Sequence, residues 1–585
     1  MSREDLVCGV AQSVVGQPWR WRRGGGDELG LSLTDQLLLG RGVDRAELAR
    51  HREPTIRDFL PDPSHFADMD AAAARIADAI DAGETIAIFG DYDVDGATSA
   101  ALLTLLLRRL GVEPLVYIPD RLMEGYGPSG RALVELKARG ASLAITVDCG
   151  AQAFEALDEA AAAGLEVIVC DHHQCAARHP VATAFINPNR LDESETGAAH
   201  GHLAAVGMAF LLGVALLREL RRRGRFADGA EPKIIDLLDL VALGTVADVA
   251  RLKSLNRAFV TQGLKVLAAR QNVGMVALAE AARLVRTPTA RDLGFALGPR
   301  INAGGRVGKS DLGVRLLTAT DPEEARAIAA ELDRLNEERR AIEQLVTDQA
   351  LEQAAQQAGA PVILVSGRGW HPGVVGIVAS RLKERFGRPA LVVAEEEDGT
   401  GKGSGRSING VDLGSAVLAA KDHGLLRAGG GHAMAAGVTV APGGLSALRD
   451  FLVERLAAPV EAAVGGRALT IDALVSPGGV AGTLCDELEA AGPYGAGWPG
   501  PRLAVGPARL VKPGIVGNGH VRAIAAGDDG KSFKLIAFRA ADTPLGQAML
   551  SAAPDARWWL AGSIRRDEWT GGNAAEMHLD DLAAA

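Results

Sequence analysis

The sequence has few aromatic residues and few cysteines. Phe, Trp and Tyr make up only 4% of its 585 residues, so the hydrophobic core must consist mainly of Leu, Val, Ile and Ala. The five cysteines are an odd number, and their spacing forms no disulfide framework. We therefore expect reduced thiols and a cytoplasmic protein.

The sequence also lacks long apolar runs and an excess of positive charge. No run is long enough to span a bilayer, and the first residues, MSREDLVCGV, lack the basic start and apolar stretch of a signal peptide. These absences argue against a membrane partner. Because the formal net charge is −11, any contact with nucleic acid must use a local basic groove rather than the whole surface.

Short apolar runs alternate with Ala-rich helical stretches in the first half of the chain. The runs at 85–90, 114–119, 143–147 and 166–170 predict buried parallel strands. The segments between them predict crossover helices. This alternation is typical of an α/β fold with a doubly wound parallel sheet.

The second half of the chain predicts three further parts. Residues 231–320 are expected to be mainly helical, with an irregular segment at 298–311, and a long polar helix at 322–357 links two domains. A second, smaller α/β domain follows, and the last part has the short strands of an OB-fold β-barrel. The expected domains are an N-terminal extension (1–58), the first α/β domain (59–320), the linking helix (321–358), the second α/β domain (359–460) and the barrel (461–585).

Acidic residues and histidines follow three of the predicted strands. The first group lies in a loop, GDYDVDGATS, whose alternate side chains point to the same side if the loop is extended. The carboxyl ends of parallel strands share one sheet edge, so the groups are expected to meet there. They are Asp91, Asp93 and Asp95; Asp148; Asp171, His172 and His173; and, after an apolar helical run, Asp248.

Carboxylate and imidazole ligands together favour Mn²⁺ or Mg²⁺ over metals that prefer thiolates. Several carboxylates in one place repel each other unless a cation is present. Two divalent ions roughly 3.5–4 Å apart can activate a water and orient a phosphodiester. Taken singly, the motifs also fit a solvated turn, a helix cap and a surface histidine pair, but three groups at three consecutive strand ends favour a site for two divalent ions.

The four motifs DYDVDG, VDCG, DHH and GTVADV resemble, in order and spacing, the metal-binding motifs of the DHH phosphoesterase superfamily. The longer forms GDYDVDGATS and GTVADVARLKSLNRAFVTQGL resemble its RecJ branch. Some members carry a His four residues before the Asp93 position, where this chain has Phe89. The resemblance implies that Asp93 holds one ion and that Asp95 and His172 hold the other. It implies that Asp148 and Asp248 are shared or flanking ligands and that Asp91 and Asp171 are inner or orienting carboxylates. It also implies that His173 lies near the phosphate and assists the leaving group.

Two glycine-rich motifs, GSGRS and GGGHAMAAG, resemble the DHH-associated substrate domain. Singly, such motifs also fit plain turns with solvated arginines. In RecJ-like proteins, the residues matching Arg121, Arg306, Ser404 and Arg406 form a pocket for a terminal 5′-phosphate. The further substrate contacts we expect are Tyr126, as a stacking ring, and Arg300, Asn302 and His432.

The C-terminal segment GPYGAGWPGPR resembles a RecJ motif, with Trp498 in place of the expected Asn. Phe538, Trp558 and Trp559 are expected to be barrel core. The residues that could follow a strand are Arg522, Lys531, Lys534, Arg539, Arg565 and Arg566, with Trp569 as a stacking ring.

The resemblance implies a metal-dependent exonuclease that degrades single-stranded DNA from the 5′ end to 5′-mononucleotides in DNA repair and recombination. It also implies a single-strand-binding protein and a RecQ-type helicase as partners. Two alternatives remain open. One is another DHH phosphodiesterase, such as a nanoRNase, a nucleotide phosphatase or a pyrophosphatase, and the other is a non-catalytic relative that binds single strands.

Overall fold

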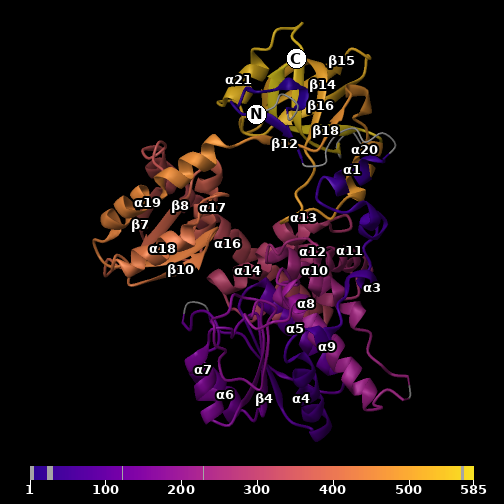
Figure 1. Cartoon of the computed structure of the whole chain (residues 1–585), viewed down its shortest axis with the longest axis vertical. Helices are drawn as coiled ribbons and strands as arrows, with labels where there is room; N and C mark the ends of the chain where they lie inside the picture. Colours follow the sequence, from indigo (N-terminus) through magenta and orange to yellow (C-terminus); the bar gives the residue numbers. More distant parts are fainter. Residues whose placement is uncertain (1–5, 23–30, 121–122, 228, 568–571) are drawn as a thin grey trace.

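A computed structural model describes residues 6–22, 31–120, 123–227, 229–567 and 572–585. Three units are visible in Figure 1: a helix-rich unit at the bottom, a smaller unit at the left and a β-barrel at the top. The C-terminus and the first described residues lie at the barrel. No helix among the described residues is both long and apolar enough to cross a membrane.

The first unit contains a five-stranded, fully parallel sheet with strand order β3-β2-β4-β5-β6. Alternate residues of β2 enter different cores. Ile86 and Ile88 pack beneath α5 (Val94–Arg109) and α9 (Ala205–Arg222), whereas Ala87 and Phe89 pack beneath α6 (Gly130–Ala138) and α7 (Phe154–Ala162). Both faces are therefore covered, which confirms the doubly wound prediction. The strands are β2 (Ile86–Gly90), β3 (Leu115–Tyr117), β4 (Leu143–Val147), β5 (Glu166–Cys170) and β6 (Ala184–Ile186), of which β6 was not predicted.

Helices surround this sheet and continue beyond it. Those before and around the sheet are α1 (Leu33–Leu39), α2 (Leu48–Arg52), α3 (Ile56–Phe59), α4 (Met69–Ala82), α5 (Val94–Arg109), α6 (Gly130–Ala138), α7 (Phe154–Ala162), α8 (Glu195–Ala198) and α9 (Ala205–Arg222). Those that follow are α10 (Leu238–Ala247), α11 (Leu255–Ala268), α12 (Val273–Ala281), α13 (Ala290–Asp292), the π-helical η6 (Leu293–Leu297), α14 (Gly298–Val307) and α15 (Leu312–Leu317).

The prediction of an irregular segment at 298–311 is wrong for most of its length, because α14 occupies residues 298–307. The glycines that suggested irregularity serve close packing. A Cβ on Gly305 would lie 2.7 Å from the carbonyl oxygen of Tyr92. The helix can therefore lie directly against the loop that carries the first acidic motif.

The long linking helix is α16 (Pro322–Ala355), with 34 residues. Asp321 caps it by accepting hydrogen bonds from the backbone amides of Glu323 and Glu324. At a rise of ~1.5 Å per residue the helix is roughly 50 Å long. It packs against α12 and α14 in the first unit and against α17 in the second, so it joins the two.

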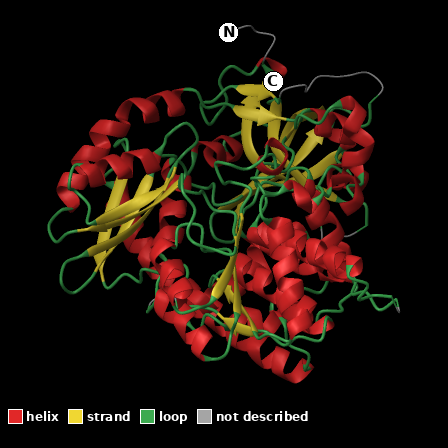
Figure 2. Cartoon of the chain, turned by 60° about the horizontal axis from the view of Figure 1, so that its bottom comes forward, coloured by secondary structure: helices red, strands yellow, loops and turns green. Residues whose placement is uncertain are grey.

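The second unit contains a mixed sheet with strand order β10-β11-β9-β8-β7, seen as a separate yellow layer in Figure 2. The glycine-rich motif GSGRS, which taken singly also fits a plain turn, lies almost entirely in the strand β9. A Cβ on Gly403 would lie 2.8 Å from Val393, so neighbouring side chains fill the space above the strand. The elements are β7 (Ile363–Arg368), α17 (Val375–Phe386), β8 (Ala390–Glu395), β9 (Gly401–Arg406), α18 (Leu413–Asp422), β10 (Ala428–His432), β11 (Ala435–Val440) and α19 (Leu445–Gly465).

The third unit is a barrel in which β17 pairs with both β18 and β14 and so closes the sheet. The OB-fold prediction is confirmed, but Phe538 is not core, because its side chain is 54% exposed. Trp558 and Trp559 are partly buried against the barrel. The elements are β12 (Leu469–Ile471), β13 (Ala473–Val475), α20 (Gly482–Ala490), β14 (Leu503–Val516), β15 (His520–Gly527), β16 (Ser532–Ala537), α21 (Pro544–Leu550), β17 (Trp558–Arg566) and β18 (Ala575–Ala584).

The N-terminal extension is packed on the barrel. Its strand β1 (Trp19–Trp21) pairs in parallel with β12. Trp19 is fully buried, and its indole N–H donates to the Asp581 carboxylate near the C-terminus, at 3.0 Å. Residues from the two ends of the chain therefore share one core.

A joint around Trp498 fixes the barrel to the first unit. The buried Arg257 guanidinium in α11 lies over the Trp498 ring, 4.1 Å from its centroid, and donates to the Gly492 carbonyl at 2.8 Å. The Trp498 indole N–H donates to the Ala491 carbonyl at 3.0 Å. The residue that departs from the expected Asn therefore stabilises an interdomain contact through packing and a hydrogen bond.

Candidate active site

The acidic residues and histidines meet at the carboxyl edge of the parallel sheet. Nε2 of His172 lies 3.2 Å from Oδ1 of Asp148 and 3.8 Å from Oδ2 of Asp95. In three groups, one ligand atom per residue lies within 4.8 Å of the others. The groups are Asp95, His172 and Asp248; Asp91, Asp93 and Asp148; and Asp148, His172 and His173.

The first motif is shaped by the start of α5 rather than by an extended loop. Asp93 is the N-cap, and its Oδ1 accepts hydrogen bonds from the amides of Asp95, at 2.8 Å, and Gly96, at 3.1 Å. Asp95 therefore lies in the first helical turn. A Cβ on Gly96 would lie 2.4 Å from the Asp91 carbonyl oxygen, so only glycine permits this tight turn.

Asp95 is held by a helix from a different part of the chain. Its carboxylate accepts hydrogen bonds from the amides of Ala205, at 2.7 Å, and Val206, at 2.9 Å, at the start of α9. These amides were not predicted as part of the site. The available signal was that the N-cap of α9 is Ala204, whose side chain cannot cap a helix, so the first amides need an acceptor from elsewhere.

Asp171 orients the two histidines. Its carboxylate accepts hydrogen bonds from the amides of Ala151, at 2.9 Å, and His172, at 2.7 Å. It also pairs with Nδ1 of His173 at 2.8 Å. Asp148, in contrast, caps no helix. Its backbone has the left-handed φ of 62°, and its carbonyl accepts a hydrogen bond from the Tyr126 hydroxyl at 3.2 Å.

His172 is oriented as a metal ligand. Its Nδ1 lies 2.9 Å from the Leu203 carbonyl, which requires a proton on Nδ1. Nε2 then faces the carboxylates, and this buried atom has no hydrogen-bond partner among the described residues. An imidazole fixed in this tautomer by a backbone carbonyl is typical of a metal ligand.

Burial and mutual repulsion make the carboxylates reluctant to ionise. Burial, followed by the charges of Asp95 and Asp93, raises the pKa of Asp148 well above its ordinary value and raises the pKa of Asp248 to about 9. Burial also raises the pKa of Asp95. A bound cation removes this penalty, and the carboxylate and imidazole donors fit divalent Mn²⁺ or Mg²⁺.

His173 and Asp171 show the opposite electrostatic behaviour. Burial is the largest single effect on the pKa of His173 and lowers it, but the hydrogen bond to Asp171 and the negative charges of Asp171, Asp248 and Asp95 together outweigh burial and raise the pKa to about 9. Burial raises the pKa of Asp171, but the hydrogen bond and the charge of His173, together with smaller effects, outweigh burial and lower the pKa to about 2. The pair therefore favours a protonated His173 beside an ionised Asp171.

Metal removal should destabilise the protein more at about pH 8 than at about pH 6. A carboxyl with a raised pKa stabilises the folded state below its unfolded pKa, about 3.9, and this contribution is lost as the pH rises through the folded-state value, about 9 for Asp248. Mn²⁺ offsets that loss and binds the ionised form. Melting temperatures with excess MnCl₂ and with EDTA measure the difference, and a metal-induced shift that is equal at the two pH values would contradict this account.

A cavity of about 340 Å³ opens beside the carboxylates. From α14, Asn302 and Arg306 reach into it, so the structure brings these two predicted residues to the acidic cluster. Its other lining residues are Asp91, Tyr92, Asp93, Tyr126, Asp148, His173, Ala247 and Asp248.

The remaining predicted substrate residues lie outside this cavity. Arg300 is not brought to it, because its buried guanidinium pairs with Asp333 in α16 at 2.8 Å. His432 is exposed at the end of β10. Arg121 and Trp569 lie outside the described residues.

Ser404 and Arg406 lie on β9 in the second unit and contact each other, with Nη1 of Arg406 donating to the Ser404 hydroxyl at 2.8 Å. Oγ of Ser404 and Nη2 of Arg406 each lie 3.1 Å from the position that a Cβ would take on Gly376. Arg306 approaches the same segment by donating to the Gly373 carbonyl at 2.7 Å. The segment 373–376 therefore contacts residues from both units, a connection that the sequence did not reveal.

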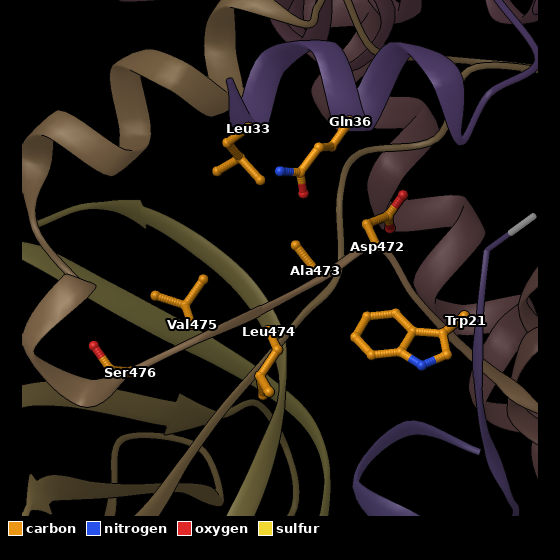
Figure 3. A pocket seen from close by; sticks show the side chains of 8 residues that line it. All are labelled: Trp21, Leu33, Gln36, Asp472, Ala473, Leu474, Val475 and Ser476. Atoms are coloured by element: carbon orange, nitrogen blue, oxygen red, sulfur yellow. The ribbon is translucent and has the colours of Figure 1, made fainter. Parts of the chain in front are cut away.

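A second cavity of about 340 Å³ lies between the N-terminal segment and the barrel, lined by Trp21, Gln36 and Asp472 among others (Figure 3). Its one carboxylate is already paired, since Asp472 lies 2.7 Å from Arg22 and 3.0 Å from Arg41. None of the acidic motifs reaches it. The cavity beside the carboxylates is therefore the candidate active site.

Three family models match the chain in sequence. They are the DHH family N-terminal domain over residues 85–245, the DHHA1 domain over 343–458 and the RecJ OB domain over 471–581. These ranges fall in the first unit, in the second unit with part of α16, and in the barrel.

Relatives match over most of the chain. The single-stranded-DNA-specific exonuclease RecJ of Dickeya dadantii is 39% identical over 84% of this chain and 86% of its own. Crystal structures of RecJ from Thermus thermophilus, in complex with Mn²⁺ and with Mg²⁺, superpose with TM-scores of 0.75 and 0.70 at 31% and 30% identity. They cover 96% and 97% of this chain and 79% and 78% of those chains. The chain therefore belongs to the RecJ family.

Proposed function

We propose that this protein is a metal-dependent exonuclease that hydrolyses single-stranded DNA from the 5′ end and releases 5′-mononucleotides. The observation that carries the proposal is the convergence of Asp95, Asp148, His172 and their neighbours beside a cavity. The exonuclease activity and the use of Mn²⁺ or Mg²⁺ are supported by the family relationship. The polarity and the roles of single residues rest on the contacts described above.

Each group around the cavity has a part in this proposal. Asp93 and Asp91 would hold one ion, Asp95, His172 and Asp248 the other, and Asp148 lies close to both groups. Divalent ions supply the positive charge that activates a water and neutralises charge on the phosphate. The chain's own contribution is to fix its ligands in place through Leu203, the α9 amides and Asp171.

His173 is placed to hold a proton at the cavity. Nδ1 is bound to Asp171 at 2.8 Å, and the Tyr126 hydroxyl lies 3.1 Å from the same nitrogen. The ring lines the cavity, so its charge can stabilise a phosphate oxygen or protonate the departing 3′ oxygen. Tyr126, whose hydroxyl is engaged with Asp148 and His173, serves to position the imidazole.

Arg306, Ser404 and Arg406 are proposed to bind the terminal 5′-phosphate, with Arg121 as a further contact. Burial lowers the pKa of Arg406, and this guanidinium has no carboxylate partner among the described residues. A partly buried cation without a counter-ion favours binding of an anion. A pocket that accepts a charged terminus explains a preference for strand ends.

Digestion of end-labelled oligonucleotides tests the proposed function. With Mn²⁺, we expect a 5′-labelled single strand to release labelled mononucleotide at once, a 3′-labelled strand to shorten stepwise, and a blunt duplex to persist. Turnover of dinucleotides but not of long strands would favour a nanoRNase-like enzyme, and binding without turnover would favour a non-catalytic relative.

A cytoplasmic location and cooperation with a single-strand-binding protein and a RecQ-type helicase are also proposed. The location is supported by the five cysteines, which are all free. The partners follow from the repair and recombination role that family membership implies. Co-purification of the tagged protein with each partner, with and without nuclease treatment, distinguishes direct contact from contact through DNA.

A further inference from the structure

Asparagine side chains hold the backbone around the proposed metal ligands. After β6, Nδ2 of Asn189 donates to two carbonyls, that of His172 at 2.6 Å and that of Gly201 at 3.2 Å. Next to it, the fully buried Asn187 donates to the His173 carbonyl at 2.9 Å. The loop that carries both histidines is therefore fixed to the chain that follows β6.

Asn256, in the first turn of α11, makes a similar connection on the other side of the site. Its side chain is fully buried, and Nδ2 donates to the His202 carbonyl at 2.8 Å and to the Arg251 carbonyl at 3.0 Å. Arg251 belongs to the loop that follows Asp248. One side-chain amide therefore joins the loop behind this proposed ligand to the segment 201–206.

The segment 201–206 is where these connections meet. The Leu203 carbonyl fixes the His172 ring, and the first amides of α9 hold the Asp95 carboxylate. The two asparagines that bridge pairs of carbonyls donate to the residues directly before Leu203. A shift of this segment would therefore move the supports of His172 and Asp95 together.

Gly201 allows the Asn189 side chain to approach this segment closely. A Cβ on Gly201 would lie 2.4 Å from Oδ1 of Asn189, so a larger residue must displace the side-chain amide. The hydrogen bonds of Asn189 thus depend on a glycine in the partner segment.

The loop 249–254 has a strained backbone. Val249 has a φ of 61° and Ser254 a φ of 46°, and a β-branched residue rarely adopts the left-handed conformation. Such residues persist where the surrounding structure holds them in place. Between them, the loop is held by Asn256 and by the Leu252 amide, which donates to a carbonyl of the joint to the barrel at 2.8 Å.

We propose that Asn189 and Asn256 are positioning residues of the metal site. They act through the backbone: Asn189 holds the loop that carries His172, and Asn256 holds the loop behind Asp248. Contacts of this kind, one step removed from the ion, set metal affinity because they orient the ligands. The inference rests on the proposed function and adds to the metal centre two residues outside the acidic and histidine motifs.

Mn²⁺ binding to the full-length protein without DNA tests this role, measured from the electron paramagnetic resonance signal of free Mn²⁺. Loss of a side chain that orients metal ligands lowers metal affinity about tenfold to a hundredfold, so Asn189→Ala and Asn256→Ala should raise the Kd for Mn²⁺ by this factor. Excess Mn²⁺ should restore much of kcat for a 5′-phosphorylated strand, and the KM for that strand should stay unchanged.

Two further substitutions separate positioning from general stability. Asn272 also donates to a backbone carbonyl, that of Leu317 at 3.0 Å, so Asn272→Ala should lower the melting temperature without changing the Kd for Mn²⁺. Gly201→Ala displaces the Asn189 side chain without removing it and should weaken Mn²⁺ binding in the same direction. Its control is Gly359→Ala, since a Cβ on Gly359 has no neighbour within 4 Å.

A Kd for Mn²⁺ within twofold of wild type in both asparagine variants would overturn the inference. An equal loss of affinity in Asn272→Ala would also overturn it, because the effect would then follow from lower stability alone. A wild-type protein that binds Mn²⁺ but leaves single strands intact would instead refute the proposed function, and the role of the two asparagines in metal binding would stand.

Discussion

Replacing Asp148 with Asn should abolish cleavage and leave the protein folded. Asp148 belongs to two of the three ligand groups. Loss of several kcal/mol of the transition-state stabilisation that the metal ions supply lowers the rate roughly a thousandfold or more. Asn is preferable to Ala here, because the backbone has a φ of 62° and Asn tolerates this left-handed conformation well. Single-turnover cleavage of a 5′-phosphorylated strand with Mn²⁺, together with thermal melting, measures both effects.

Asp68 provides a matched control for this substitution. It has the same left-handed conformation, with a φ of 61°, but its carboxylate pairs with Arg190 outside the acidic cluster. Asp68→Asn should keep nearly full activity. Cleavage by Asp148→Asn within tenfold of wild type would show that Asp148 is not a metal ligand, and the assignment of both ion sites would have to be revised.

Replacing Arg406 with Gln should separate substrates by their terminal group. Hydrogen bonds to a charged group contribute ~1.5–3 kcal/mol, so kcat/KM for a 5′-phosphorylated strand should fall about tenfold to a hundredfold. The kcat/KM for strands with a 5′-hydroxyl should change little, because these strands have no terminal phosphate for Arg406 to contact. Since burial lowers the pKa of Arg406, removing its charge should not lower the melting temperature.

Arg368→Gln in β7 is the control for this experiment, because the Arg368 side chain is 84% exposed in the same unit. It should leave the ratio of the two substrates unchanged. An equal loss on phosphate and hydroxyl ends in Arg406→Gln would mean that the residue supports the sheet and does not recognise the terminus.

The parallel sheet could be predicted because its strands are buried on both faces. The runs at 143–147 and 166–170 coincide with β4 and β5 to the residue. Short, continuous runs of β-branched and apolar residues are typical of strands in a parallel sheet that is covered on both faces. Because the metal-ligand candidates follow directly after these strands, their meeting at one edge could also be predicted. β6 was missed although β3 is equally short, because β3 stands within the mostly apolar run at 114–119, whereas β6 lies between Thr183 and Asn187.

Glycine-rich segments could not be predicted in the same way. Gly305 in α14 and Gly403 in β9 suggested irregular backbone, but each allows a regular element to approach a neighbour that would clash with a Cβ. Only the tertiary structure reveals those neighbours. The exposure of Phe538 could not be predicted either, since a ring at the end of a barrel strand is normally core, and only the structure places this ring on the barrel surface beside His520 and His578.

The pairing of β1 with β12 has a consequence for biosynthesis. Trp19 and Asp581 are separated by 562 residues, so β1 leaves the ribosome long before β12 and Asp581, which it contacts in the folded protein. Until then its apolar side chains stay without cover, and closing so long a loop is slow. A chain interrupted before β12 therefore carries Trp19 without the neighbours that bury it, and chaperones and proteases can distinguish such a chain from the folded protein.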